Sequence, residues 1–159
     1  MNLNQRIGNS DFRYAEFVKS DFAIRNNINN IPNKFEIYNI ENLVRYCLQP
    51  IRDYFGPIRV LSGFRCSRLN VAIGGSKHSN HLFGYAADIE PIEHGVELID
   101  VIEWIVKNLK YKELIAEYFP FGWIHIAYQE NTFRTGLKLK NESYDYERMT
   151  IDDLKRIYH

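Results

Sequence analysis

Apolar residues recur along this chain with two periods, one typical of helices and one typical of strands. Between residues 39 and 55, and again between 96 and 109, they recur every three or four positions, which predicts two helices with one buried face each. Strands are predicted at four short β-prone runs, 58–61, 85–90, 113–117 and 123–128. The strands do not alternate regularly with helices, so we expect an α+β fold in which helices pack on a small, largely antiparallel sheet.

Capping and helix-breaking residues mark the limits of several elements. Pro50 removes a backbone donor inside the first helix, so we expect a kink there. Ser67 is predicted to cap a short helix that Gly74 ends. The residues expected on the buried face of the first helix are Leu43, Tyr46, Cys47, Ile51 and Tyr54.

Both ends of the chain are more polar than its middle. Residues 1–33 are predicted to contain one short helix, from 10 to 19, followed by an asparagine-rich loop. In the polar tail, residues 131–159, Thr150 is predicted to cap a last helix that contains Leu154.

Composition limits the classes of function. The chain has 159 residues without an internal repeat, which predicts one domain spanning residues 1–159. Lys and Arg together number 20, as do Asp and Glu, so no net charge attracts the protein to nucleic acid or to an anionic membrane. We therefore expect neither nucleic-acid binding nor membrane insertion, and we expect a monomer.

The beginning of the chain bears on localisation. The first ten residues lack the apolar run of a secretory signal peptide, and no stretch has the roughly 18 apolar residues of a transmembrane helix. We therefore expect synthesis in the cytoplasm, and any action outside the cell would require another route of release.

Cys47 and Cys66 are the two cysteines of the chain. Two cysteines are too few for a disulfide scaffold, and this pair lacks the close spacing of a thiolate metal site. Cys47 falls in the apolar helix and Cys66 in a predicted loop. We expect two free thiols, and a bridge between them is the alternative.

The segment from 79 to 88 combines residue types that bind metal ions. His81 offers an imidazole nitrogen and Asp88 a carboxylate, both of which are good ligands for Zn²⁺. Gly84 lies between them and permits a tight turn, so the two side chains can return to one point. Asp88 also stands in an apolar strand, where a carboxylate needs a partner, and a metal ion would supply one.

A third ligand is needed for such a site, and His125 is the candidate. On the predicted strand 123–128 it would share a face with Trp123, while Ile124 and Ile126 would face the core. Three protein ligands with one open position is the pattern of catalytic zinc. The alternative is that His125 is an ordinary buried histidine.

These residues form an ordered series of motifs. The series is Ser79-x-His81-x-x-Gly84-x-Ala86-x-Asp88, followed by Trp123-x-His125. Together with segments 56–65 and 69–76, it resembles the D-alanyl-D-alanine carboxypeptidase-like zinc peptidases over roughly residues 11–130. That family includes bacterial enzymes acting on cell-wall D-alanine peptides and phage endolysins that cut peptidoglycan stem peptides, and hedgehog signalling domains share its fold.

The resemblance implies a hedgehog-like fold and a role for each matching residue. His81, Asp88 and His125 would bind zinc. Arg65 would hold a carbonyl or carboxylate of the substrate and steady a developing oxyanion, unless it forms a surface ion pair instead. Ser79 would bind substrate or orient neighbouring groups through its hydroxyl, unless it is simply a turn residue.

The catalytic base is not where many members of the family carry it. They place an acid three residues before the last histidine, and this chain has Gly122 there. The nearest acid upstream is Glu117, at the end of the predicted strand 113–117. One branch of the family, common in phage and prophage proteins, carries a glutamate at such a position. The resemblance therefore implies Glu117 as the base, with a solvated strand end as the alternative.

We therefore expect a zinc metallopeptidase that hydrolyses peptide bonds of peptidoglycan stem peptides, as a D-Ala-D-Ala carboxypeptidase or as an endolysin-type endopeptidase. A phage origin would place its action on the cell wall after release, or within a phage particle. The alternative is a non-catalytic, zinc-containing binding or structural module of the same fold, which Gly122 favours. The sequence leaves open which bond is cut.

Overall fold

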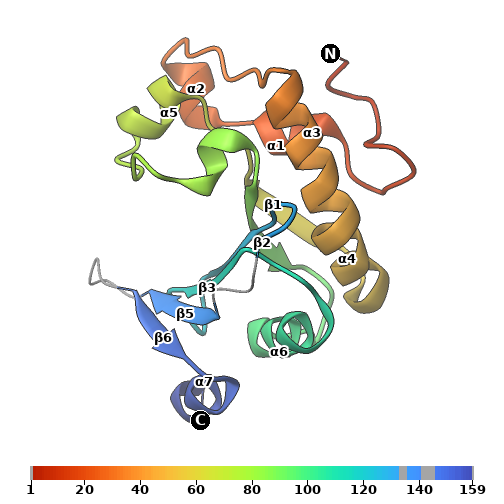
Figure 1. Ribbon diagram of the computed structural model, residues 1–159, viewed down its shortest axis with the longest axis vertical. Coiled ribbons are helices and arrows are strands. Elements are labelled where there is room, and N and C mark those ends of the chain that lie inside the picture. Colours follow the sequence, from red (N-terminus) through yellow and green to blue (C-terminus); the bar gives the residue numbers. More distant parts are fainter. Residues whose placement is uncertain (1, 133–135, 141–145, 159) are drawn as a thin grey trace.

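A single twisted sheet forms the centre of the molecule in Figure 1. The computed structural model describes residues 2–132, 136–140 and 146–158. The strands within these ranges are β1 (Ile58–Ser62), β2 (Ala86–Pro91), β3 (Glu113–Glu117), β4 (Trp123–Ala127), β5 (Leu137–Lys140) and β6 (Glu147–Met149). They lie in the order β1-β2-β4-β3-β5-β6, and the neighbouring pairs are antiparallel except for β3 and β5. The predicted α+β fold with a largely antiparallel sheet is confirmed.

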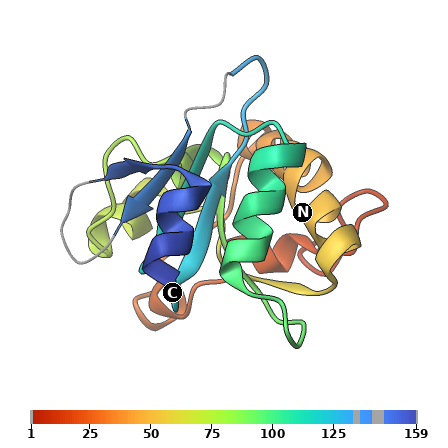
Figure 2. The ribbon, with the colours of Figure 1, turned by 90° about the horizontal axis from the view of Figure 1, so that it is seen from below.

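Two helices lie side by side against one face of the sheet, as Figure 2 shows: α6 (Leu98–Asn108) and α7 (Ile151–Tyr158). Leu114 of β3 and Ile126 of β4 belong to the same buried core as Ile102 of α6. Because successive side chains of a strand point to opposite faces, Ile115 and His125 must lie on the other face. That face is the one on which the candidate site is built.

The N-terminal half of the chain carries the remaining helices. They are α1 (Tyr14–Val18), α2 (Asp21–Arg25), α3 (Lys34–Leu43), a π-helical turn (Val44–Leu48), α4 (Gln49–Phe55), α5 (Ser67–Ala72) and a 3₁₀ turn (Asn80–Phe83). The predicted helix over 10–19 is limited to α1, because Lys19 is extended and Ser20 caps a separate helix by accepting from the backbone N–H of Ala23. Among the described residues, no helix is both long and apolar enough to cross a membrane.

The long helix predicted over 39–55 begins five residues earlier, at Lys34. Asn33 caps it, because its side-chain oxygen accepts hydrogen bonds from the backbone N–H groups of Phe35 and Glu36. The predicted start was therefore wrong: an asparagine that reads as part of a loop is in fact the cap.

The distortion expected at Pro50 takes the form of the π-helical turn, which directly precedes α4. Two tyrosines expected on the buried face are instead at the surface, with Tyr46 39% exposed and Tyr54 65% exposed. Their rings stack on Tyr128 and Trp104 with centroids 5.0 Å apart in each case. The three residues of that predicted face that are buried are Leu43, Cys47 and Ile51.

The tail is part of the fold rather than a polar appendage. β5 pairs in parallel with β3 and buries Leu137 and Leu139, and α7 buries Leu154. Thr150 caps α7 as predicted, because its hydroxyl accepts from the backbone N–H of Asp153 at 3.1 Å. The predicted last helix is confirmed.

Cys66, and not Ser67, is the residue before α5, and its side chain makes no capping hydrogen bond, so the predicted cap was wrong. Both cysteines are free, as expected. Cys47 is fully buried, and burial raises the pKa of its thiol to about 12.

The 3₁₀ turn packs on α3 through a close backbone approach. Gly84, which ends the turn, has φ +72°, and a Cβ added there would lie 2.5 Å from the carbonyl oxygen of Glu36. Next to it, the side-chain amide of Asn39 donates to the carbonyl of Phe83 at 2.8 Å. Glycine therefore allows the turn to lie directly against the helix.

The substitution Gly84→Ala should destabilise the protein more than Gly74→Ala does. Gly74 has nearly the same backbone conformation, φ +75°, but a Cβ added there would meet no atom within 4 Å. We expect Gly74→Ala to lower the free energy of unfolding by about 1–2 kcal/mol through backbone strain, and Gly84→Ala to lower it by roughly twice as much because of the added clash. Urea denaturation measures both, and equal losses would contradict the close approach.

Candidate metal centre

The pairing of two central strands brings two candidate ligands face to face. β2 and β4 run antiparallel, with Asp88 directly opposite His125 and Ala87 opposite Ile126. Side chains of directly opposed residues point to the same face of a sheet. The register therefore places a carboxylate and an imidazole together, on the face away from α6.

His81 reaches the same place from the 3₁₀ turn. Ser79 caps this turn, and its hydroxyl accepts from the backbone N–H of His81 at 3.3 Å. The Nδ1 atom of His81 donates to the carbonyl oxygen of Gly63 at 2.6 Å, which leaves the lone pair of Nε2 available on the side of the strands. Ser79 thus has the turn role left open by the sequence, and its contact with substrate stays a prediction.

The carbonyl that orients His81 is itself held by α1. A Cβ added at Gly63 would lie 2.6 Å from both the Cα and the carbonyl oxygen of Phe17, so the two backbones are in close contact. The backbone N–H of Phe64 donates to that same Phe17 carbonyl at 2.7 Å. Helix α1 therefore helps to position a candidate ligand through the carbonyl of Gly63.

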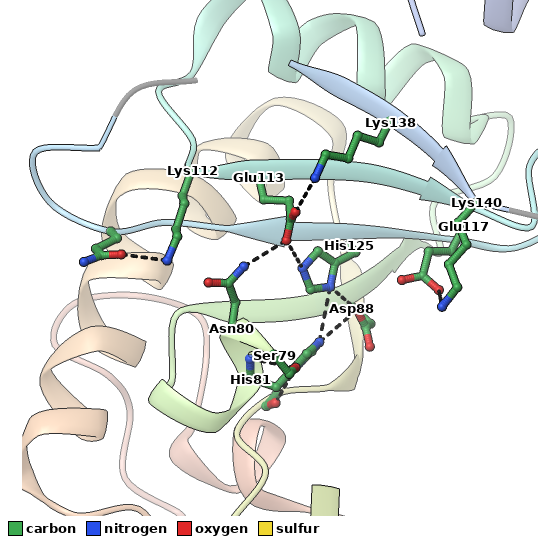
Figure 3. Close-up of polar contacts among 12 residues, drawn as sticks. Ser79, Asn80, His81, Asp88, Lys112, Glu113, Glu117, His125, Lys138 and Lys140 are labelled. Atoms are coloured by element: carbon green, nitrogen blue, oxygen red, sulfur yellow. Dashed lines mark hydrogen bonds and ion pairs between the residues drawn. The ribbon is translucent and has the colours of Figure 1, made fainter. Parts of the chain in front are cut away.

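The three side chains form a compact set of donor atoms, seen together in Figure 3. The Nδ1 atom of His125 lies 2.8 Å from Oδ1 of Asp88, and Nε2 of His81 lies 3.2 Å from each of these atoms. Two ligands bound at about 2.1 Å to a tetrahedral zinc ion would lie about 3.4 Å apart, so small shifts would admit the ion. Both histidines are almost inaccessible to solvent. The set fits zinc in chemistry and in spacing.

Burial and mutual contacts determine the charges of the cluster. Burial lowers the pKa of His81, which keeps it neutral. Burial alone would raise the pKa of Asp88, but the two histidines outweigh it and the pKa is lowered. Burial alone would lower the pKa of His125, but its hydrogen bond to Asp88 and the nearby carboxylate of Glu113 raise it to about 9. At neutral pH and without metal, His125 is therefore positively charged, with a proton on each ring nitrogen.

Strand β3 presents two glutamates to the site face. Glu113, Ile115 and Glu117 alternate along the strand, and Ile115 is directly opposite His125, so the glutamates flank that histidine (Figure 3). Oε2 of Glu113 lies 3.5 Å from Nε2 of His125. Sequence reasoning missed Glu113, although the two-residue period of the strand that ends in Glu117 would have indicated it.

Glu117 is 8% exposed, so it is not the solvated strand end left open as the alternative. Burial raises the pKa of its carboxyl group and the negative charge of Asp88 adds to the effect, while Lys140, with Nζ 3.6 Å away, opposes it. A buried carboxylate with a raised pKa is suited to accepting a proton.

Position 122 has no room for an acidic side chain. A Cβ added there would lie 1.8 Å from the carbonyl oxygen of Glu117, so the β3–β4 hairpin has no room for a side chain at this position. Glu117 is directly opposite Trp123 and places its own carboxylate on the site face. The geometry of the hairpin therefore requires glycine at position 122.

The cluster lies in a cleft of about 600 Å³. Arg65 lines it, and its backbone N–H donates to the carbonyl of His81 at 3.1 Å. Two buried donors in this cleft, Nε of Arg65 and Nε1 of Trp123, have no acceptor among the described residues. Within the same residues Arg65 makes no surface ion pair, so that alternative is not supported. Other residues that line the cleft are Ser79, Glu113, Glu117, Lys140 and Tyr146.

Comparison with protein-family models matches residues 10–127 to the family described as Peptidase M15. The match spans most of the chain and includes every candidate site residue identified from the sequence. It ends before β5. Comparison with curated proteins found no match.

Zinc binding should release about one proton at pH 7. The proton comes from His125, whose raised pKa of about 9 keeps it charged until a metal takes Nδ1, whereas His81 and Asp88 already have their metal-binding charge. We therefore expect the apparent affinity for zinc to rise about tenfold per pH unit between 7 and 9. Calorimetry in two buffers of different ionisation enthalpy measures the released proton, and an affinity that does not change with pH would contradict this assignment.

Proposed function

The chain belongs to the peptidase M15 family, whose members are zinc-dependent metallopeptidases, and from this premise we propose that it hydrolyses peptide bonds in the stem peptides of bacterial peptidoglycan. The zinc ion would be held by His81, Asp88 and His125. One observation carries the proposal: the metal-binding cluster, a buried carboxylate and two unpartnered donors line the same cleft.

The proton transfers are assigned to Glu117. When bound, zinc would polarise the substrate carbonyl and allow attack by water near neutral pH. Glu117 would accept the proton of the attacking water at its carboxylate and then donate it to the leaving amine. Its raised pKa supports both steps, because a stronger base accepts the proton of water more readily and its protonated form holds that proton nearer neutral pH until the amine leaves.

The unpartnered donors suit the oxygen atoms of a peptide substrate. Arg65 would donate through Nε to the substrate carbonyl, to the oxyanion that develops from it, or to a terminal carboxylate. Trp123 would donate through Nε1 to a neighbouring carbonyl. Buried donors without acceptors are costly, so a ligand that satisfies both gains affinity and a fixed orientation.

The choice of peptidoglycan rests on the family resemblance of the ordered motifs. Stem peptides carry carboxylates, and the cleft offers the cationic side chains of Arg65 and Lys140 to them. The position of Glu117 supports the phage and prophage branch, and with it an endolysin-type action on the cell wall. A D-Ala-D-Ala carboxypeptidase would use the same groups on a terminal bond. The non-catalytic alternative relied on Gly122, which the hairpin now explains.

Hydrolysis of purified peptidoglycan, with the fragments identified by mass spectrometry, tests the proposal and identifies the bond. The zinc-loaded protein should create new termini, and His81→Ala should create none. Glu117→Gln should keep zinc but lower the rate by about 10²–10⁴-fold, because it removes the proton acceptor. Full activity of Glu117→Gln would refute its assignment as base. Stoichiometric zinc without cleavage by the wild-type protein would favour the non-catalytic module.

Lys140→Met should move the acid limb of the pH–rate profile to higher pH. The charge of Lys140 lowers the pKa of Glu117, so its removal raises that pKa and less of the base is deprotonated at a given acidic pH. Profiles of kcat/KM for the two proteins measure the shift. A shift towards lower pH, or none, would show that Glu117 does not govern this limb.

A further inference from the structure

The far side of the His125 ring faces a second carboxylate. Nδ1 of this ring belongs to the cluster of donor atoms, while Nε2 is buried and has its nearest described partner in Oε2 of Glu113, at 3.5 Å. A neutral imidazole that offers the lone pair of Nδ1 carries its proton on Nε2. That buried N–H group needs an acceptor, and Glu113 is placed to be one.

Glu113 is held in place by two donors from distant segments. The side-chain amide of Asn80 donates to Oε2 at 2.8 Å, and Nζ of Lys138 contacts Oε1 at 2.8 Å (Figure 3). Asn80 is the residue before His81 in the 3₁₀ turn. Its contact with Glu113 therefore also links this turn to β3, the strand that pairs with the strand of His125. The imidazole of His125 and the ammonium group of Lys138 lower the pKa of Glu113 to about 2 in spite of its burial.

We propose that Glu113 is a positioning residue for the metal centre, which accepts the Nε2–H of His125 and so keeps Nδ1 directed at the metal. Lys138, on β5, keeps the carboxylate of Glu113 in place. The inference rests on the proposed function, because it requires zinc at the cluster. Carboxylates that accept from a metal-binding histidine in this way strengthen metal binding in other proteins.

The contacts of Glu113 distinguish its role from that of Glu117. Glu113 faces an amide, an ammonium and an imidazole, all of which favour its ionised form, and its pKa is lowered. Glu117 has one ammonium at 3.6 Å, and its pKa is raised. Glu113 is thus fixed by three neighbours, one of them a proposed metal ligand, whereas among the described residues Glu117 has a single cation beside it. These contacts suit Glu113 to holding a neighbour and leave Glu117 free to exchange protons.

Lys138 comes from outside the segment that matches the family. The match ends at residue 127, and β5 begins at Leu137. The parallel pairing of β5 with β3 places Lys138 opposite Ile115, on the strand that carries both glutamates. A segment beyond the family match therefore supports the metal centre.

Zinc affinity, measured by competition with a chromophoric chelator, tests this without any substrate. Glu113→Leu should weaken zinc binding by about 10–100-fold, and Glu113→Gln should weaken it less, because the amide oxygen still accepts from His125. The matched control is Glu103→Leu, which removes an acid that pairs with Lys107 and Lys155 on the surface of α6 and should leave the affinity unchanged. Wild-type affinity in a folded Glu113→Leu protein would overturn the proposal.

A double-mutant cycle separates positioning from general stability. Lys138→Met should weaken zinc binding in the wild-type background and have no further effect in Glu113→Leu, whereas Lys155→Met should have none in either. Additive losses would overturn the role of Lys138.

If Glu113→Leu does not fold, zinc affinity is measured in Glu113→Gln instead, and the Nε2–H signal of His125 is followed by ¹⁵N NMR in Lys138→Met. Weaker zinc binding and the loss of a protected Nε2–H signal would support the proposal. No change in either measurement would overturn it. If the protein binds zinc but does not hydrolyse peptidoglycan, the proposed peptidase activity is refuted and the positioning role of Glu113 is not affected.

Discussion

The antiparallel register between β2 and β4 is the constraint on which the site depends. It sets Asp88 opposite His125, and a slip of one residue would turn one of the two towards α6. The buried residues Ile89, Ile124 and Ile126 alternate with the ligands and prevent such a slip, because it would expose them. The pairing of β2 with β4 thus packs the core and assembles the donor atoms at the same time.

Most site residues recognised from the sequence lie on strands and turns that a short stretch of sequence is enough to predict. The hairpin of 113–117 and 123–127 was predicted almost to the residue, because period-two alternation and the Pro and Gly between the strands are visible without tertiary information. The spacing of His81, Gly84 and Asp88 likewise describes one turn and one strand. Sequence could therefore predict which side chains face the cleft from these elements.

What the sequence could not predict depends on contacts between distant segments. Lys138 is an ordinary lysine of a polar tail until β5 joins β3, and the acceptor for His81 is a backbone carbonyl that α1 holds in place. In the sequence, the absence of an acid at Gly122 favours the non-catalytic alternative, whereas the structure shows that the hairpin leaves no space for any side chain there. Tyr46 and Tyr54 have the correct spacing for burial, but they find aromatic partners at the surface.

The parallel pairing of β5 with β3 also bears on the order in which the molecule can be completed. The metal-binding residues are synthesised by residue 125, but until Leu137–Lys140 leaves the ribosome, β3 is the outermost strand and its backbone N–H and C=O groups on one side are unpaired. Such an edge can pair with another chain, and the apolar residues beneath it lack α7 as a cover. A fragment that ends where the family match ends would therefore be prone to aggregation, and the folding unit extends to the last helix.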